Sequence, residues 1–201
     1  MKRNLLAMAL VIGAAVPAQA AYKIVPSGKW AAVAKSVLTV KPDQAWNRIG
    51  ARPGRNAESW TLDGIPLNDL TFYGGIANDT ALFREVDKKN RPLPRFSSTM
   101  LIPDIAQLFE ASYRIAVSTS LMSIDSIEPA TFAGQPGFRF AYSFTVQNEE
   151  VKRLGEARGA VIDGKLYLIT FEAPAIHYFD RSVGAFRVVA DSASVPVAPK
   201  R

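Results

Sequence analysis

The fold is decided by residues 138–171, which read FRFAYSFTVQNEEVKRLGEARGAVIDGKLYLITF. The first part of this stretch alternates apolar and polar side chains, with the apolar ones at Phe138, Phe140, Tyr142, Phe144 and Val146. Because successive side chains of a β-strand point to opposite faces, this spacing predicts a strand that buries one aromatic face.

The second part of the stretch predicts a β-hairpin. Two runs with strand character, residues 151–162 and 165–171, are separated only by Asp163-Gly164. An Asp-Gly pair between two such runs is typical of the two-residue type I′ turn. Direct pairing across this turn places Ala160 opposite Tyr167 and Arg158 opposite Ile169.

Shorter runs with strand character occur outside this stretch, at residues 36–40, 58–62, 68–76 and 121–132. Within residues 68–76, Leu70 and Phe72 fall on one face and Thr71 and Tyr73 on the other. Gly74-Gly75 near the end of this run indicates a bulge or a close approach of another backbone.

The connections between these runs carry turn residues. Residues 42–46 predict a turn with a short helix-like step that buries Trp46, and residues 135–137 predict a turn. Residues 77–103 form a long connection without regular signals, which is typical of a functional or mobile segment.

Two amphipathic helices are expected. The first begins at Pro103-Asp104, and its apolar stripe consists of Ile105, Leu108, Phe109, Ser112, Ile115 and Ala116. The second spans residues 175–192, and its stripe consists of Ile176, Phe179, Val183, Phe186, Val189 and Ala190. Consecutive antiparallel strands with two such helices predict an α+β domain, in which helices pack on an antiparallel β-sheet.

The first twenty residues read MKRNLLAMALVIGAAVPAQA. A basic start, a short apolar run and an Ala-x-Ala ending predict a secretory signal peptide over residues 1–20, cleaved between Ala20 and Ala21. The apolar run is shorter than the ~20 residues that a membrane-spanning helix needs. We therefore expect a periplasmic or secreted protein with no transmembrane segment in the mature chain. Within it, residues 21–35 would be a lead-in, residues 36–192 a single domain and residues 193–201 a flexible tail.

The composition excludes several classes of function. The chain has no cysteine, so a lipid-modified cysteine, thiol catalysis and cysteine-bound metals are ruled out. The formal charge of +6 includes Lys2 and Arg3 of the signal peptide, so the mature chain carries 24 − 2 − 18 = +4. We expect no nucleic-acid binding, because that would need many basic side chains gathered on one face.

The candidate interaction residues come from two features. The densest basic segment, residues 88–95, contains Lys88, Lys89, Arg91 and Arg95. It is either a contact for an anionic surface, such as lipid headgroups, or a solvated loop. Two aromatic residues near turns, Trp60 and Tyr73, either line a groove or belong to the core.

No catalytic group can be assigned from the sequence. The single histidine, His177, is expected in the first turn of the last helix, as a general base, a ligand or an ordinary helix residue. The other acidic candidates are interpreted as loop or turn carboxylates, namely Asp63, Asp69, Asp79 and Glu149-Glu150. Metal-site spacings and phosphate-binding motifs are absent, so we expect no catalytic residue, metal or cofactor. A carboxylate pair brought together by folding is the route to hydrolysis that the sequence leaves open.

The order of these elements resembles the PsbP-like fold, which is named for an extrinsic subunit of photosystem II. The resemblance rests on the aromatic strand 138–146, the hairpin with Gly159-Ala160-Val161 and residues 165–171, and the closing helix ending in Asp191-Ser192. It covers roughly residues 36–192. The chain is also similar to small exported bacterial proteins of unknown function. The resemblance implies a sheet between helices and a non-catalytic role in docking on a partner protein, and it carries over no functional residue.

These observations favour a non-catalytic exported envelope protein that binds a protein partner or a small ligand. Two alternatives remain: a carboxylate-based hydrolase, and a peripheral binder of anionic membrane that uses residues 88–95. A deep pocket with converging carboxylates would favour the enzyme, and a shallow apolar patch would favour binding.

Overall fold

Residues 22–117, 119, 121–146 and 150–197 are described in the computed structural model of the chain. The predicted signal peptide and its cleavage site lie outside the described residues. So do residues 147–149, which include the acidic candidate Glu149.

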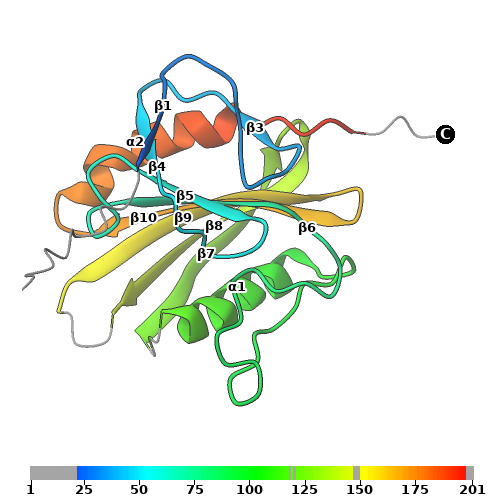
Figure 1. The fold of residues 1–201 in the computed structure, drawn as a ribbon. Helices are drawn as coiled ribbons and strands as arrows, with labels where there is room; N and C mark the ends of the chain where they lie inside the picture. The colour runs from blue at the N-terminus through cyan, green and yellow to red at the C-terminus, as the bar shows by residue number, and fades with distance from the viewer. Residues whose placement is uncertain (1–21, 118, 120, 147–149, 198–201) are drawn as a thin grey trace, which may run out of the picture.

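An eight-stranded antiparallel sheet lies between two helices (Figure 1), and its strand order is β1-β4-β5-β6-β10-β9-β8-β7. The strands are β1 (Lys23–Val25), β4 (Trp46–Arg48), β5 (Ala57–Thr61), β6 (Asp69–Ile76), β7 (Leu121–Phe132), β8 (Gln135–Thr145), β9 (Lys152–Ile162) and β10 (Lys165–Pro174). Two short strands, β2 (Ala31–Ala32) and β3 (Thr39–Val40), form a separate sheet. Helix α1 (Ile102–Ala116) covers one face of the large sheet and α2 (Tyr178–Asp191) covers the other. The predicted α+β architecture is confirmed.

The β9–β10 hairpin forms in the predicted register. The two expected cross-strand pairs, Ala160–Tyr167 and Arg158–Ile169, are both present. Asp163 and Gly164 have φ values of 49° and 72°. Positive φ at both positions is what a type I′ turn requires, and this turn matches the twist of the paired strands.

Side-chain alternation divides the sheet between two cores. The core under α2 includes Trp46, Trp60, Leu70, Phe72, Phe171 and Phe186. The core under α1 includes Tyr73, Phe109, Phe138, Phe140, Tyr142 and Phe144. The ring of Phe109, on α1, lies 5.5 Å from that of Phe140 and 5.1 Å from that of Tyr142, measured between centroids. The aromatic face predicted for β8 is therefore buried under α1.

The predicted bulge near the end of β6 is also present. The pairing of β6 with β10 shifts register where Gly74 pairs with Tyr167 and Ile76 with Leu166. Gly75 lies between them with a φ of 69°, which a glycine adopts without steric cost. At Gly74, a Cβ atom would lie 2.2 Å from Ser36 Oγ, so another segment does approach the backbone closely.

The N-terminal and C-terminal boundaries differ from the prediction. Residues 21–35 are more than a lead-in, because they contain β1 and β2 and bury Val25 and Val33 in the core under α2. The predicted start of the flexible tail, residue 193, is too early in the sequence, because Ala193 and Val195 pack in that same core. Ser194 also forms a β-bridge with Thr39 of β3.

Three internal predictions are wrong in detail. Residues 36–40 contribute only β3, because the chain turns through Ala34 and Lys35 with positive φ. Trp46 is buried as expected, but it begins strand β4 instead of sitting on a helix-like step. The turn before β8 is Ala133-Gly134 rather than residues 135–137, and both of its residues have positive φ.

Helix α2 begins later than predicted because β10 runs on to Pro174. Pro174 pairs with Arg153 of β9, and the next residue donates its N–H to the Lys152 carbonyl at 2.9 Å. The chain must then turn before it enters the helix. His177 is the exposed residue that precedes the helix, with a φ of 67°, and Ile176 is 76% exposed instead of belonging to the apolar stripe.

Candidate functional site

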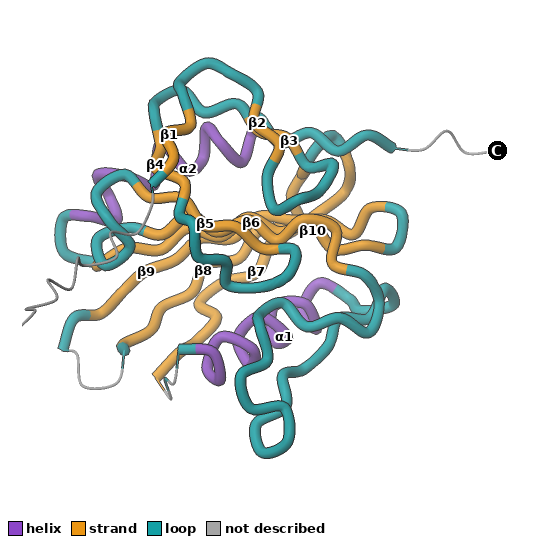
Figure 2. Tube along the Cα trace, in the orientation of Figure 1, coloured by secondary structure: helices purple, strands orange, loops and turns teal. Residues whose placement is uncertain are grey.

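A cavity of about 490 Å³ opens on the α1 side of the sheet. Its walls come from β6, β10, the C-terminal half of α1 and residues 77–101. Figure 2 shows residues 77–101 as a long loop beside α1. Two buried side chains of this loop, Leu82 and Phe96, join the α1-side core and hold the loop against the helix, and Leu93 is buried as well. The connection that the sequence left without regular structure is thus a wall of the cavity.

Five polar or aromatic side chains of neighbouring strands face this cavity together. Strand β6 contributes Asp69, Thr71 and Tyr73, and β10 contributes Thr170 and Glu172. They share one face because each strand alternates, and the register sets Asp69 opposite Glu172 and Thr71 opposite Thr170. Two carboxyl groups therefore lie side by side on the cavity wall, and we refer to Asp69 and Glu172 as the carboxyl pair.

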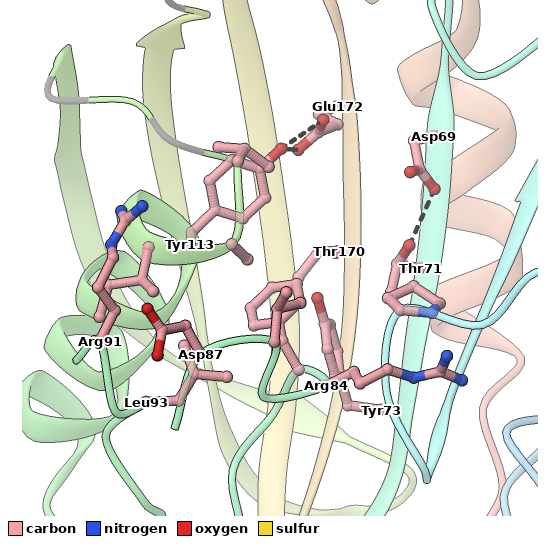
Figure 3. A pocket seen from close by; sticks show the side chains of 16 residues that line it. Asp69, Thr71, Tyr73, Arg84, Asp87, Arg91, Leu93, Tyr113, Thr170 and Glu172 are labelled. Atoms are coloured by element: carbon pink, nitrogen blue, oxygen red, sulfur yellow. Dashed lines mark hydrogen bonds between the residues drawn. The ribbon is translucent and has the colours of Figure 1, made fainter. Parts of the chain in front are cut away.

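Tyrosine hydroxyls hold Glu172 in place. The Tyr113 hydroxyl, from α1, donates to the Glu172 carboxylate and lies 2.6 Å from both oxygens (Figure 3). The Tyr142 hydroxyl, from β8, lies 3.2 Å from Oε2. Tyr142 reaches this far because β9 has Gly155 between Tyr142 and Glu172 in the cross-strand row. A Cβ atom at Gly155 would lie 2.1 Å from the Tyr142 ring, so the ring can cross β9 only over a glycine.

The other member of the pair has fewer partners. Asp69 Oδ1 accepts a hydrogen bond from the Thr71 hydroxyl at 2.8 Å, which Figure 3 shows, and Thr71 in turn lies 2.5 Å from Ser59 Oγ. Since Asp69 lines the cavity, its carboxyl group is also available to a molecule placed there.

Both carboxyl groups hold their protons more tightly than usual. Burial raises the pKa of Asp69 to about 6, and the hydrogen bonds from Thr71 and Ser59 limit that rise. Burial also raises the pKa of Glu172 to about 7, with a further contribution from the negative charge of Asp69. The two groups titrate as a coupled pair, so near neutral pH the cavity wall carries fewer than two negative charges.

The remainder of the cavity is largely apolar and aromatic. Tyr73, Phe83 and Tyr113 line it, and Phe83 contacts both tyrosines edge-on, at centroid distances of 5.6 Å and 6.0 Å. Aliphatic side chains include Leu93 and Ile115. A few polar groups on an apolar wall are the usual composition of a small-molecule site.

The basic segment divides between the cavity and the surface. Arg91 lines the cavity together with Arg84 and Asp87. Arg95 instead donates to the Asp79 carbonyl at 2.7 Å and forms ion pairs with Asp79 and Glu85. Lys88 and Lys89 are exposed on the loop. The four candidate basic residues do not act as one group.

The two candidate aromatic residues also separate. Tyr73 lines the cavity, and burial raises its pKa well above the usual value. Trp60 is completely buried in the core under α2, on the opposite face of the sheet. Its Nε1 donates to Glu58 at 2.8 Å, and Glu58 also pairs with Arg48 and Arg52. Trp60 is a core residue because the alternation of β5 turns its side chain to the α2 side of the sheet.

The sequence did not identify the carboxyl pair. Asp69 falls within the predicted strand 68–76 but is interpreted from the sequence as a turn carboxylate, whereas it begins β6 and faces the cavity. Glu172 is not a candidate in the sequence because the predicted strand ends at Phe171, whereas β10 continues to Pro174. The remaining acidic candidates lie away from the cavity: Asp63 pairs with Arg181, Asp79 pairs with Arg95 and Glu150 is exposed. The described part of the chain contains no group of three or more His, Asp or Glu side chains arranged to hold a metal.

Comparisons with known proteins give the fold. No protein-family model matches the chain, and none of the curated proteins matches its sequence. The solution structure of cyanobacterial PsbP from Synechocystis matches with a TM-score of 0.51 and 18% sequence identity, over 95% of this chain and 99% of that one. The chain therefore has a PsbP-like fold, as the order of its sequence elements predicted.

Two further solved structures match with lower scores. The immunity protein TplEi from Pseudomonas aeruginosa has a TM-score of 0.39 and 9% identity, over 77% of this chain and 46% of that one. LpqN from Mycobacterium tuberculosis, a protein involved in cell envelope biogenesis, has a TM-score of 0.37 and 11% identity, over 89% and 86% of the two chains. Neither of the two described helices is long and apolar enough to cross a membrane.

Proposed function

We propose that this chain is an exported, non-catalytic binding protein that holds a small organic ligand in the cavity between β6, β10, α1 and residues 77–101. The observation that carries the proposal is the carboxyl pair on an otherwise apolar and aromatic wall. A cavity of about 490 Å³ is within the size range of small-molecule sites. Apolar walls supply affinity for such a ligand, and a few polar groups fix its orientation.

The arrangement of the carboxyl pair supports binding more than turnover. The Tyr113 hydroxyl donates to the Glu172 carboxylate and lies 2.6 Å from either oxygen, and Tyr142 adds a bond to Oε2. These phenols hold the carboxylate in one position. The histidine of the chain, His177, is exposed at the start of α2, on the opposite face of the sheet, so no imidazole serves the cavity as a base.

The predicted signal peptide places this function outside the cytoplasm. A periplasmic or secreted protein would meet its ligand after cleavage at Ala20/Ala21. N-terminal sequencing of the exported chain should then begin Ala-Tyr-Lys. An intact Met1 in the soluble mature protein would contradict export, but it would not bear on ligand binding in the cavity. A protein partner in the envelope, which the fold resemblance implies, would act on another surface.

A cavity-filling substitution tests the proposal. Ala116 lies on α1, is exposed and lines the cavity, so Ala116→Phe should occupy part of its volume without disturbing the core. Ala111→Phe, at an exposed position of the same helix outside the cavity, is the matched control. The probe is N-phenylnaphthylamine, an uncharged apolar fluorophore. We expect saturable binding that Ala116→Phe weakens about tenfold or more, while the control binds like the wild type. Equal binding by both variants, or no saturable binding, would contradict the proposal.

The hydrolase remains the second candidate, because the carboxyl pair favours it. Two adjacent carboxyl groups with raised pKa values can act as general acid and general base. Chromogenic nitrophenyl glycosides and esters would report such an activity. Under the binding proposal, no turnover above background is expected. Turnover that both Asp69→Asn and Glu172→Gln abolish, in folded protein, would establish the hydrolase instead.

Membrane binding through residues 88–95 is supported less well. All four cations of the segment are exposed, but Arg95 is engaged by acidic side chains and Arg91 lines the cavity, which leaves Lys88 and Lys89 for a membrane contact. Each basic side chain near an anionic membrane contributes about 1 kcal/mol, so two lysines would give only weak attachment.

A further inference from the structure

We infer that the ligand of the cavity is an organic cation, an ammonium group on an apolar body, whose charge lies against Asp69 and Glu172. This inference rests on the proposed function and adds the chemical class of the ligand. Three features of the described residues carry it: the missing countercharge of the carboxyl pair, the aromatic rings beside it, and the apolar remainder of the cavity.

The countercharge argument comes from the other buried carboxylates of this chain. Glu58 is 2% exposed and forms ion pairs with Arg48 and Arg52. Glu156 is 9% exposed and forms ion pairs with Arg158 and Arg187. The rule in this fold is that a buried carboxylate takes two guanidinium partners, as expected from the cost of burying an unpaired charge.

Asp69 and Glu172, which are half-buried on the cavity wall, have no such guanidinium partners. No Lys, Arg or His of the described residues lies within ion-pair distance of either carboxyl group. The basic residue that influences both is Arg153. Its guanidinium is engaged elsewhere, because it donates to the Pro66 carbonyl at 2.8 Å and lies over the Phe144 ring. A cation bound in the cavity would supply the missing partner.

The aromatic lining fits the same kind of ligand. Tyr113 contacts Glu172, Tyr73 lies on the same face of β6 as Asp69 with Thr71 between them, and Phe83 bridges the two tyrosine rings. Aromatic rings attract ammonium groups through the negative potential of their faces, by about 0.5–2 kcal/mol for each good contact. Carboxylates with neighbouring aromatic rings recognise both the charge and the alkyl groups of an organic ammonium ion.

The remainder of the cavity distinguishes an organic cation from a metal ion. Beyond the carboxyl pair, the walls include Leu93, Ile115 and Val117, which offer no oxygen or nitrogen ligand from their side chains. A hard divalent cation takes six or more oxygen ligands. The apolar walls suit an alkyl or aryl body instead. Arg84 and Arg91 lie on the loop side, apart from the carboxyl pair in Figure 3, so they do not oppose a positive charge placed against it.

A charge-matched series of probes tests the inference. Phenethylamine, phenethyl alcohol and phenylacetate have nearly the same size and differ in charge. Binding is measured by calorimetry at about pH 8, where both groups of the carboxyl pair are ionised. We expect the amine to bind at least about tenfold more tightly than the alcohol, and the acid to bind most weakly. Asp69→Asn and Glu172→Gln should each remove this preference, while Glu128→Gln, which changes an exposed carboxylate on β7, should retain it.

The outcomes separate this inference from the proposed function. If the alcohol binds as tightly as the amine, and Ala116→Phe blocks both, the cavity is a binding site but not for a cation, and the inference is overturned. If none of the three probes binds in a way that Ala116→Phe blocks, both proposals fail. Circular dichroism of each variant checks that a loss of binding is not a loss of fold.

Discussion

Replacing Glu172 by glutamine should make the protein more stable at neutral and alkaline pH. Burial and the facing charge of Asp69 raise the pKa of Glu172 from 4.5 to about 7 in the folded chain. The folded state then binds a proton more tightly than the unfolded state does. Between about pH 4.5 and pH 7 the folded chain carries more protons, so its free energy of unfolding falls as the pH rises.

The size of the effect follows from the two pKa values. Each unit of pKa corresponds to about 1.4 kcal/mol. The rise of the Glu172 pKa from 4.5 to about 7 therefore means ~3 kcal/mol of stability lost once the group is ionised. Glutamine has nearly the same shape, still accepts a hydrogen bond from Tyr113 and carries no charge at any pH. The variant should escape this loss.

The assay is urea unfolding followed by tryptophan fluorescence, since Trp46 and Trp60 are both buried. The free energy of unfolding is compared between wild type and Glu172→Gln at several pH values from about 4 to about 8. The difference should grow with pH in favour of the variant, by ~3 kcal/mol in total. Glu128→Gln, at an exposed carboxylate paired with Arg139, is the control and should show no such growth. A difference that stays flat, or that favours the wild type at high pH, would refute the burial of an uncompensated charge.

Five further substitutions test the packing of the fold and the limits of the site. Gly155→Ala should lower the free energy of unfolding by about 2–4 kcal/mol, because the added Cβ would lie 2.1 Å from an aromatic ring. Gly184→Ala, on α2 where an added Cβ has no neighbour within 4 Å, should instead raise it by about 0.5–1 kcal/mol. Chemical unfolding measures both. Phe140→Ala should cost about 3–5 kcal/mol through lost burial and a cavity, and Ser143→Ala far less, so equal losses would mean that the alternation of β8 does not set its buried face. His177→Ala should leave probe binding unchanged in calorimetry, because His177 is exposed and outside the cavity; lost binding or lost activity in a folded variant would make it part of the site.

Local pattern predicted the parts of the fold that depend on neighbours in sequence. The β9–β10 register followed from two adjacent strands and a two-residue turn, where little else can compete. The boundaries that failed depend on distant contacts. The sequence Glu172-Ala173-Pro174 looks like a strand end, but β9 is long enough to pair with all of it, which extends β10 and delays α2.

The carboxyl pair could not be predicted for a related reason. Asp69 and Glu172 are neighbours only because β6 pairs with β10, and four other elements lie between these strands in the sequence. No local pattern states which strands pair. The available signal was the alternation itself: continued past Phe171, it would have placed Glu172 on the α1 face with Thr170. A charged residue on an inward-facing position of a strand is a reason to look for a site.

The stability cost of the carboxyl pair is itself an argument for a function. A structural role at position 172 needs only an acceptor for the Tyr113 and Tyr142 hydroxyls, and glutamine would supply one without a buried charge. The chain instead has two adjacent carboxyl groups with raised pKa values, and Gly155 lets Tyr142 of β8 reach Glu172. Where a less destabilising residue would serve the fold, the presence of a destabilising one indicates that the site has another role. A bound cation would offset much of that cost, since it would stabilise the ionised form of both groups.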